Sequence, residues 1–244
     1  IIYKEFYFLH NLLHLTGKIT KQPFIDEKSK IVCLFNGEIY NYKFFGNYKS
    51  DGYCIIDCYH KYGTDFIKQL DGEFAICLFD FSKNIFIIST DVFATKPLWY
   101  AIDKGKLGIS TYESGLKRAN LNNRIKLNPN TTKIFNISTL ELINTQRVFI
   151  FDYNQHKLTY NDWSNAFTNS IKKRTNNNNY PVYVCLSSGY DSGCICACLN
   201  YIRKPFYTYT ILADENKETI KKRTIINKQI TNSNVELIEF TKDE

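Results

Sequence analysis

The ten residues from Cys185 to Cys194, Cys-Leu-Ser-Ser-Gly-Tyr-Asp-Ser-Gly-Cys, constrain the fold of this 244-residue chain more than any other segment. They follow an apolar run, Val182–Leu186, and precede small residues typical of a helix. A strand, a tight Ser/Gly turn and a helix start form a cradle for anions, because backbone N–H groups and the positive end of the helix dipole point at the turn. The Asp191 carboxylate would repel a bare anion, so its presence indicates a divalent cation that bridges it to the phosphate. This favours ATP with Mg²⁺ over phosphate alone as the ligand. The alternative is a buried strand that ends in an ordinary turn.

This segment lacks the Gly-Lys-Ser/Thr of a Walker loop. It resembles the pyrophosphatase loop, Ser-Gly-Gly-x-Asp-Ser, of enzymes that cleave ATP to AMP and pyrophosphate while they adenylate a substrate. Two positions differ from that pattern: Ser188 stands where the family usually has glycine, and Gly193 replaces a frequent serine. Since a side chain limits how closely a phosphate can approach a turn, Ser188 puts the geometry of the loop in question.

A second group of motifs precedes this loop in the chain. In order, these motifs are Phe35-Asn-Gly-Glu-Ile-Tyr-Asn41, Ser50-Asp51, Leu70-Asp-Gly-Glu-Phe-Ala75 and Thr90-Asp-Val-Phe-Ala-Thr-Lys-Pro-Leu-Trp-Tyr100. Together they resemble the glutaminase domain of asparagine synthetase and its class II amidotransferase relatives, where a domain with the pyrophosphatase loop follows. The resemblance implies an α+β glutaminase domain of the N-terminal-nucleophile type, layered α-β-β-α, over residues 1–150. It implies the start of an α/β, parallel-sheet ATP-pyrophosphatase domain over residues 157–244.

The hydrophobic pattern predicts elements that fit two such domains. In the first part it predicts buried strands at Val32–Phe35, Phe74–Phe79 and Ile85–Ser89, a helix over Cys54–Leu70, and two hairpin-like strands at Thr132–Ile137 and Thr145–Phe151. In the second part it predicts a helix over Leu158–Arg174, a surface loop at Asn176–Asn179, strands at Tyr180–Leu186, Phe206–Leu212 and Val235–Phe240, and helices ending near Tyr201 and Thr231. This second alternation predicts a parallel sheet with its ligand at the carboxyl ends of the strands.

The resemblance assigns roles to four residues of the first domain. Asn36 and Gly37 match the oxyanion hole, where a side-chain amide and a backbone N–H stabilise the developing charge. Glu38 and Asp51 match the carboxylates that bind the α-amino group of glutamine. Without this context, Asn-Gly is also a common hairpin turn, and each acid could be a solvated surface residue.

Two features depart from that glutaminase pattern. The family's nucleophile is an N-terminal cysteine, but position 1 is isoleucine and the first cysteine, Cys33, falls within a predicted strand. We therefore expect the chain to be a fragment that lacks its nucleophile and alone neither hydrolyses glutamine nor makes asparagine. Leu12 occupies the place of the arginine that clamps the substrate carboxylate, so either binding is weaker, another cation substitutes, or the alignment slips here.

In the second domain the resemblance implies a site for ATP. Leu186 and Ile211 match positions that line the nucleotide pocket. The pyrophosphate would be held by Ser187, Gly189, Asp191 and Ser192, with Mg²⁺ bound at Asp191 through the pyrophosphate.

Composition excludes several classes of function. The net charge is +7, but the lysines are dispersed and form no stripe, which argues against nucleic-acid binding. No apolar run approaches the roughly 20 residues that span a bilayer, so we expect a soluble protein without a membrane partner. The eight cysteines lie mostly in apolar stretches, which predicts reduced thiols and a cytoplasmic location. We expect small buried residues of a helix, and not a metal site, at Cys194, Cys196 and Cys198.

The resemblance thus implies an ATP-dependent, glutamine-hydrolysing ligase that makes asparagine from aspartate through an aspartyl-AMP intermediate. Its expected partners are glutamine, aspartate and ATP with Mg²⁺, and a homodimer is left open. One alternative is a related amidotransferase with another carboxylate acceptor. Another is a non-catalytic relative that serves as a binding module, motivated by Leu12, Ser188 and the missing cysteine.

Overall fold

The computed structural model describes residues 1–176, 180–212 and 215–239. The chain divides into two compact units, Ile1–Asn154 and Gln155–Glu244, and each is described by itself. Among the described residues, no helix has the length and apolar character needed to cross a membrane.

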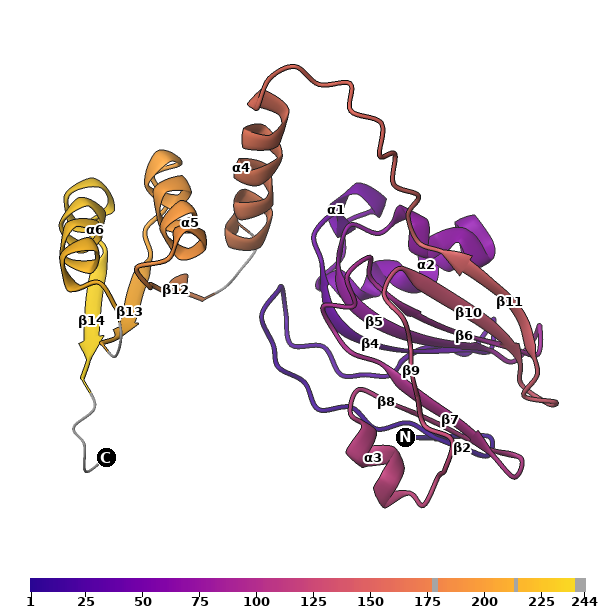
Figure 1. Cartoon of the computed structure of the whole chain (residues 1–244). Coiled ribbons are helices and arrows are strands. Elements are labelled where there is room, and N and C mark those ends of the chain that lie inside the picture. Colours follow the sequence, from indigo (N-terminus) through magenta and orange to yellow (C-terminus); the bar gives the residue numbers. More distant parts are fainter. Residues whose placement is uncertain (177–179, 213–214, 240–244) are drawn as a thin grey trace. The chain divides into compact units, whose positions relative to one another are not determined.

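The first unit is built on a six-stranded antiparallel sheet in the order β11-β10-β6-β5-β4-β3 (Figure 1). Its strands are β3 (Phe24–Asp26), β4 (Ile31–Ile39), β5 (Gly72–Asp80), β6 (Ile85–Thr90), β10 (Thr131–Asn136) and β11 (Leu142–Arg147). The three buried strands predicted from apolar runs lie in β4, β5 and β6 and are confirmed. The second hairpin strand was predicted at Thr145–Phe151, and these bounds are wrong: β11 covers Leu142–Arg147, and its pairing with β10 shifts register between Ile134 and Phe135.

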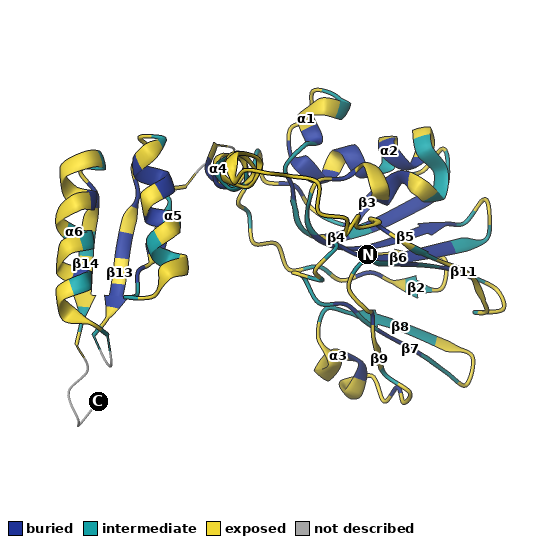
Figure 2. Cartoon of the chain, turned by 45° about the horizontal axis from the view of Figure 1, so that its top comes forward, coloured by how far each residue is buried: buried dark blue, intermediate teal, exposed yellow. Residues whose placement is uncertain are grey.

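Both faces of the central strands are buried, which explains why their sequences are apolar without interruption (Figure 2). In β5, Phe74, Ile76 and Leu78 face one core, and Ala75, Cys77 and Phe79 face the other. The sheet therefore separates two hydrophobic cores, and successive side chains along each central strand face one core and then the other.

Helical segments cover one face of this sheet (Figure 1). They are α1 (Tyr42–Phe45), the 3₁₀ turn η1 (Asp51–Tyr53), α2 (Cys54–Tyr62) and the 3₁₀ segment η2 (Gly63–Gln69). The continuous helix predicted over Cys54–Leu70 is thus interrupted, because Gly63 adopts a positive φ of 56° that ends α2.

A second sheet, in the order β8-β7-β9, packs on the other face of the first. Its strands are β7 (Trp99–Asp103), β8 (Lys106–Ser110) and β9 (Ile125–Lys126). The rings of Tyr100 and Phe135 lie 5.7 Å apart between the two sheets. Helix α3 (Glu113–Arg118) contacts β7 and β8, and a short hairpin, β1 (Ile2–Tyr3) and β2 (Phe6–Tyr7), adds aromatic rings to the same core. The layers follow the helix–sheet–sheet–helix order that the resemblance predicts.

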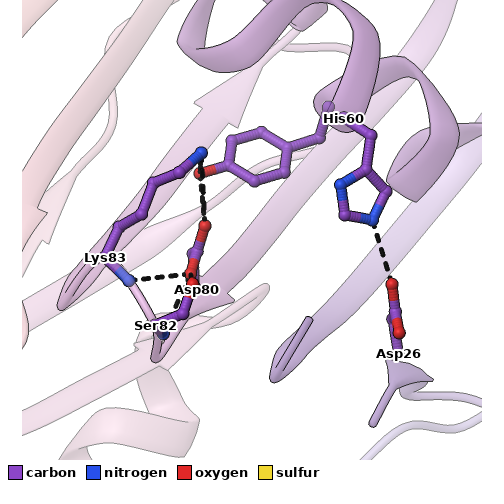
Figure 3. A network of polar contacts seen from close by, with 6 residues as sticks. Asp26, His60, Asp80, Ser82 and Lys83 are labelled. Carbon is purple, nitrogen blue, oxygen red and sulfur yellow. Dashed lines mark hydrogen bonds and ion pairs between the residues drawn. The ribbon is translucent and has the colours of Figure 1, made fainter. Parts of the chain in front are cut away.

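A polar network braces the turn between β5 and β6 (Figure 3). Asp80 is 2% exposed. It accepts hydrogen bonds from the Tyr59 hydroxyl at 2.8 Å, the Ser82 hydroxyl at 2.6 Å, and the N–H groups of Ser82 and Lys83 at 3.0 Å each. These donors hold the pKa of Asp80 below its ordinary value despite its burial.

The second unit contains a three-stranded parallel sheet in the order β12-β13-β14. Its elements are α4 (Asn161–Asn176), β12 (Tyr183–Cys185), α5 (Tyr190–Tyr201), β13 (Tyr207–Ile211), α6 (Lys217–Thr231) and β14 (Asn234–Ile238). The predicted alternation and parallel sheet are confirmed, although β12 is shorter than the predicted Tyr180–Leu186. Most of the predicted loop, at 177–179, and Phe240 of the predicted last strand lie outside the described residues.

Helix α5 corrects one expectation about the cysteines. Cys196 and Cys198 are buried, as predicted, but Cys194 is exposed, so the three are not equivalent. Among the described residues there is no group of three or more His, Cys, Asp or Glu side chains that could hold a metal ion.

Candidate functional site

A hollow in the first unit brings together the residues assigned to glutamine. Asn36, Gly37 and Glu38 of β4 line it, together with Asp51 of η1 and Leu12 of the segment before β3. Its empty volume is about 690 Å³, which includes space open to solvent. Residues some 40 positions apart in sequence therefore converge on one site.

Asn36 and Gly37 lie inside a continuous strand and not in a hairpin turn. They pair with Ala75 and Phe74 of β5, which excludes the turn interpretation of Asn-Gly. Gly37 has a φ of 147°, and a Cβ atom there would lie 1.9 Å from the carbonyl oxygen of Glu73. Only glycine fits this backbone position, so the strand can pass close to β5 and still present the Asn36 side chain to the hollow.

Asp51 is fixed by the backbone around it. Its Oδ2 atom accepts the Ile39 N–H at 2.8 Å, and its Oδ1 atom accepts the Ser50 hydroxyl at 3.1 Å. Asp51 is only 5% exposed, and burial raises its pKa above the ordinary value in spite of these donors. The carboxylate is thus held in one orientation at the end of β4.

Glu38 carries the larger perturbation of the two acids. Burial, chiefly, raises its pKa to about 7, and the nearby Asp51 charge adds to the effect. The Thr16 hydroxyl and the Lys96 charge act in the opposite direction. A half-buried and a buried carboxylate, both with raised pKa values, form a site where a bound cation would favour the ionised forms.

Sequence reasoning missed other residues of this hollow. Lys96 belongs to the Thr90–Tyr100 motif but received no role from the sequence; it lines the hollow and is the only lysine or arginine among the described residues that do so. His10 also lines it, with a pKa lowered by burial, and His14 hydrogen bonds through Nε2 to the Gly17 carbonyl oxygen at 2.8 Å. No motif could reveal Lys96 as a neighbour of Glu38, because the two are 58 positions apart in the sequence.

Asp91, in the same Thr90–Tyr100 motif, has a structural role. Asp91 is buried and braces the backbone: its carboxylate accepts the N–H groups of Phe74, Phe93 and Thr95 at 2.9 to 3.0 Å. It takes no part in lining the hollow.

No cysteine is among the described residues that line the hollow. Cys33, the nearest to Asn36 in sequence, is fully buried in β4, and burial raises the pKa of its thiol. A buried, protonated thiol is a poor nucleophile. The structure therefore agrees that Cys33 does not serve as one.

In the second unit, the predicted phosphate loop joins β12 to α5. Ser187 and Ser192 contact each other: the Ser187 N–H donates to the Ser192 hydroxyl oxygen at 3.0 Å, and the two hydroxyls lie 2.9 Å apart. Gly189 caps α5, and its N–H donates to the Ser187 hydroxyl at 3.2 Å. The loop is thus folded back on itself at the start of a helix.

Ser188 does not distort the turn. It is not among the residues with positive φ, so a serine fits its backbone without the strain that would demand glycine. Both its N–H and its hydroxyl donate to Oε2 of Glu215, which lies just before α6. These bonds lower the pKa of Glu215.

The remaining nucleotide candidates lie around this loop. Leu186 is 2% exposed and packs in the core of the unit, whereas Ile211 is 53% exposed at the end of β13. Asp191 is exposed in the first turn of α5. All six candidates therefore lie at or just beyond the carboxyl ends of β12 and β13, where parallel sheets bind ligands.

A family model described as a glutamine amidotransferase domain matches residues 9–152, more than half of the chain. A putative asparagine synthetase (glutamine-hydrolysing) of Methanocaldococcus jannaschii is 30% identical over 217 residues, covering 76% of this chain and 39% of the relative. The amidase chry2 of Gibberella zeae is 38% identical over 101 residues, covering 37% of this chain and 15% of the relative. The chain thus spans well under half the length of these relatives.

A solved glutamine phosphoribosylpyrophosphate amidotransferase of Bacillus subtilis, in complex with ADP and GMP, aligns with 88% of this chain and 48% of its own. The identity is 12% and the TM-score is 0.45.

Proposed function

The chain belongs to the glutamine amidotransferase family, and on that premise we propose that it is part of a glutamine-dependent asparagine synthetase. Its first unit would bind glutamine in the hollow beside β4. The observation that carries the proposal is the convergence of Asn36, Gly37, Glu38 and Asp51 on that hollow. Relatives that include a glutamine-hydrolysing asparagine synthetase support it.

In the proposed complex the two ends of glutamine meet different groups. Glu38 and Asp51 would bind the α-ammonium, which supplies the positive charge that their burial leaves unbalanced. Lys96 is suited to the α-carboxylate that Leu12 cannot bind. Asn36 and Gly37 would stabilise the oxyanion as the side-chain amide is attacked.

Hydrolysis also needs a thiolate delivered to the hollow, which the cysteines of the described residues do not supply. The glutaminase proposal is therefore tested first as binding. Calorimetric titration of the full chain with glutamine at pH 8 should show saturable binding, weakened at least about tenfold in Asp51→Asn, because one charged hydrogen-bonding partner is lost. Glu141→Gln, an exposed acid outside the hollow, is the matched control.

The pH dependence separates this site from a non-specific one. Because the pKa of Glu38 is about 7, the fraction of ionised Glu38 rises between pH 6 and pH 8. Affinity for glutamine should rise with it, and this rise should vanish in Glu38→Gln. Equal affinity at pH 6 and pH 8 in the unsubstituted chain would contradict the proposed role of Glu38.

The second unit would bind ATP with Mg²⁺ at the loop between β12 and α5. The fit of an anion is supported by Glu215, whose carboxylate already accepts the Ser188 N–H and hydroxyl. Asp191 alone is enough for Mg²⁺, which commonly uses one or two carboxylates together with phosphate oxygens. ATP would supply the adenylyl group that activates the carboxylate of aspartate. Leu186, Ser187, Gly189, Asp191, Ser192 and Ile211 are the proposed contacts.

A fluorescent ATP analogue titrated into the full chain tests this second site. Binding should require Mg²⁺ and should weaken in Asp191→Asn. Binding that changes neither on removal of Mg²⁺ nor in Asp191→Asn would contradict the proposed ATP site.

The acceptor could be a carboxylate other than aspartate. The similarity to an amidase over 101 residues favours keeping this second candidate. Product analysis of the full-length protein with glutamine, ATP and aspartate would decide between the two.

A further inference from the structure

We propose that Arg223 is a positioning residue for the loop between β12 and α5, where it aims two backbone N–H groups at a bound polyphosphate. The inference rests on the proposed ATP site and names a residue that the loop motif does not contain. Arg223 lies on α6, some 30 positions after the loop, and its NH1 atom donates to the carbonyl oxygens of Ser187 at 2.6 Å and Gly189 at 2.8 Å.

Peptide geometry converts these two bonds into an orientation of the loop. The carbonyl of Ser187 shares a peptide plane with the N–H of Ser188, and that of Gly189 with the N–H of Tyr190. Both peptides are trans, so the C=O and N–H of each point to opposite sides. By holding both carbonyls, Arg223 turns the N–H groups of Ser188 and Tyr190 away from itself.

Glu215 marks the side to which these groups turn. Its Oε2 atom accepts both the N–H and the hydroxyl of Ser188, and the Ser188 hydroxyl oxygen in turn accepts the Asn216 N–H at 3.2 Å. An anionic oxygen therefore already occupies part of the cradle, and a phosphate oxygen of the ligand would take its place. The Arg223 guanidinium adds positive charge behind the same loop.

Gly193 explains how the guanidinium reaches the loop. A Cβ atom at this position would lie 2.7 Å from both Cζ and NH2 of Arg223. A serine, the residue frequent in similar loops, would push the flexible end of Arg223 off the two carbonyls. The unusual glycine and the arginine are therefore coupled, and a substitution of either should have the same consequence.

A double-mutant cycle tests this coupling in the full chain, with Mg²⁺-pyrophosphate and MgATP as probes in calorimetric titrations. Arg223→Met should weaken binding about tenfold or more, because two charge-assisted hydrogen bonds are lost. Gly193→Ser should weaken it similarly, yet add nothing in the Arg223→Met background. Arg223→Lys should recover part of the affinity, since a single nitrogen makes both bonds.

The matched control is Arg203→Met, an exposed arginine with one long contact, 3.4 Å from NH1 to the Ile230 carbonyl oxygen. It should bind both probes like the unsubstituted chain. Additive losses in the double variant, or an Arg223→Met variant that binds like the control, would overturn the coupling.

A second readout keeps the inference separate from the ATP proposal. If the unsubstituted chain binds neither probe, the nucleotide function fails. The positioning role is then read from hydrogen exchange of the Ser188 and Gly189 amides, both of which are hydrogen bonded in the structure. Exchange should accelerate in Arg223→Met and Gly193→Ser but not in Arg203→Met, and unchanged exchange in the first two would reject the role.

Discussion

At the two ends of the β4–β5 ladder, the pKa values of the carboxyl groups are shifted in opposite directions. At the end where Ile31 pairs with Asp80, four donors surround one acid and lower its pKa. At the other end, where Ile39 pairs with Gly72, the half-buried Glu38 and the buried Asp51 both have raised pKa values.

This difference distinguishes Asp80, which stabilises the fold, from Glu38 and Asp51, which are suited to bind a ligand. Asp80 is satisfied within the chain, so ionisation stabilises the folded state. Glu38 and Asp51 have raised pKa values, so their ionised forms are disfavoured and a bound cation would stabilise them. The same strand pair therefore carries a structural brace at one end and a candidate binding site at the other.

The largest effect should come from breaking the ligand end of the ladder with Gly37→Ala. The added Cβ meets the Glu73 carbonyl oxygen at 1.9 Å in a backbone region closed to alanine, so we expect a loss of about 4 kcal/mol or more. Gly63→Ala is the matched control, because it also has positive φ but meets nothing within 4 Å and should cost about 1 kcal/mol. Urea unfolding followed by Trp99 fluorescence, in a Trp163→Phe background, measures both, and equal losses would contradict the close approach of β4 to β5.

The next largest effect should come from neutralising one acid at each end. Asp80→Asn should cost about 2 kcal/mol, because the Tyr59 hydroxyl and the turn N–H groups lose a charged acceptor. Asp51→Asn should change stability at pH 7 by less than about 1 kcal/mol, because the amide oxygen still accepts the Ile39 N–H while a strained charge disappears. The same urea assay compares the two variants. A larger loss of stability in Asp51→Asn than in Asp80→Asn would contradict the structural role of Asp80 and the binding role of Asp51.

A smaller effect separates the two ends by pH. The folded chain keeps a proton on Glu38 up to about pH 7, whereas the unfolded chain releases it near 4.5, so the free energy of unfolding should fall as pH rises between these values. Glu38→Gln should flatten this slope, and the control Glu141→Gln should not. Asp80 has the opposite sign: its contribution is present above its ordinary pKa of 3.8 and is lost as pH falls below it. Melting temperatures from pH 3 to pH 8 measure both limbs, and a rise in stability from pH 4.5 to pH 7 that depends on Glu38 would contradict the sign.

The smallest effect should come from the cation at the brace. The Lys83 ammonium lies 3.6 Å from Asp80 and 4.8 Å from the centre of the Tyr59 ring, but the side chain is 60% exposed. Lys83→Met should therefore cost less than about 1 kcal/mol in the urea assay. A cost comparable to that of Asp80→Asn would mean that charge pairing, and not neutral donors, satisfies this end.

The sequence predicts well what depends on neighbouring residues. Apolar runs locate β4, β5 and β6, because strands buried on both faces cannot alternate with polar residues. The alternation of strands and helices after Tyr180 likewise predicts the parallel sheet. The motifs also select Asn36, Gly37, Glu38 and Asp51, and the structure brings all four to one hollow.

The sequence fails where a contact depends on tertiary distance. Lys96 approaches Glu38, and Arg223 approaches Ser187, only because separate elements pack together. The strand β11 begins three residues earlier than predicted, and the register shift in its pairing with β10 leaves no signal in the apolar pattern. The glycine at position 193, where similar loops frequently have serine, is explained only by the Arg223 guanidinium that packs against it.

The order of strands in both principal sheets follows the order of the chain. In the first unit β3, β4, β5, β6, β10 and β11 are laid side by side in sequence order, and in the second β12, β13 and β14 are too. During synthesis, the newest strand to leave the ribosome therefore always finds its partner already emerged. Each sheet can grow at a single advancing edge, without waiting for residues still to be translated.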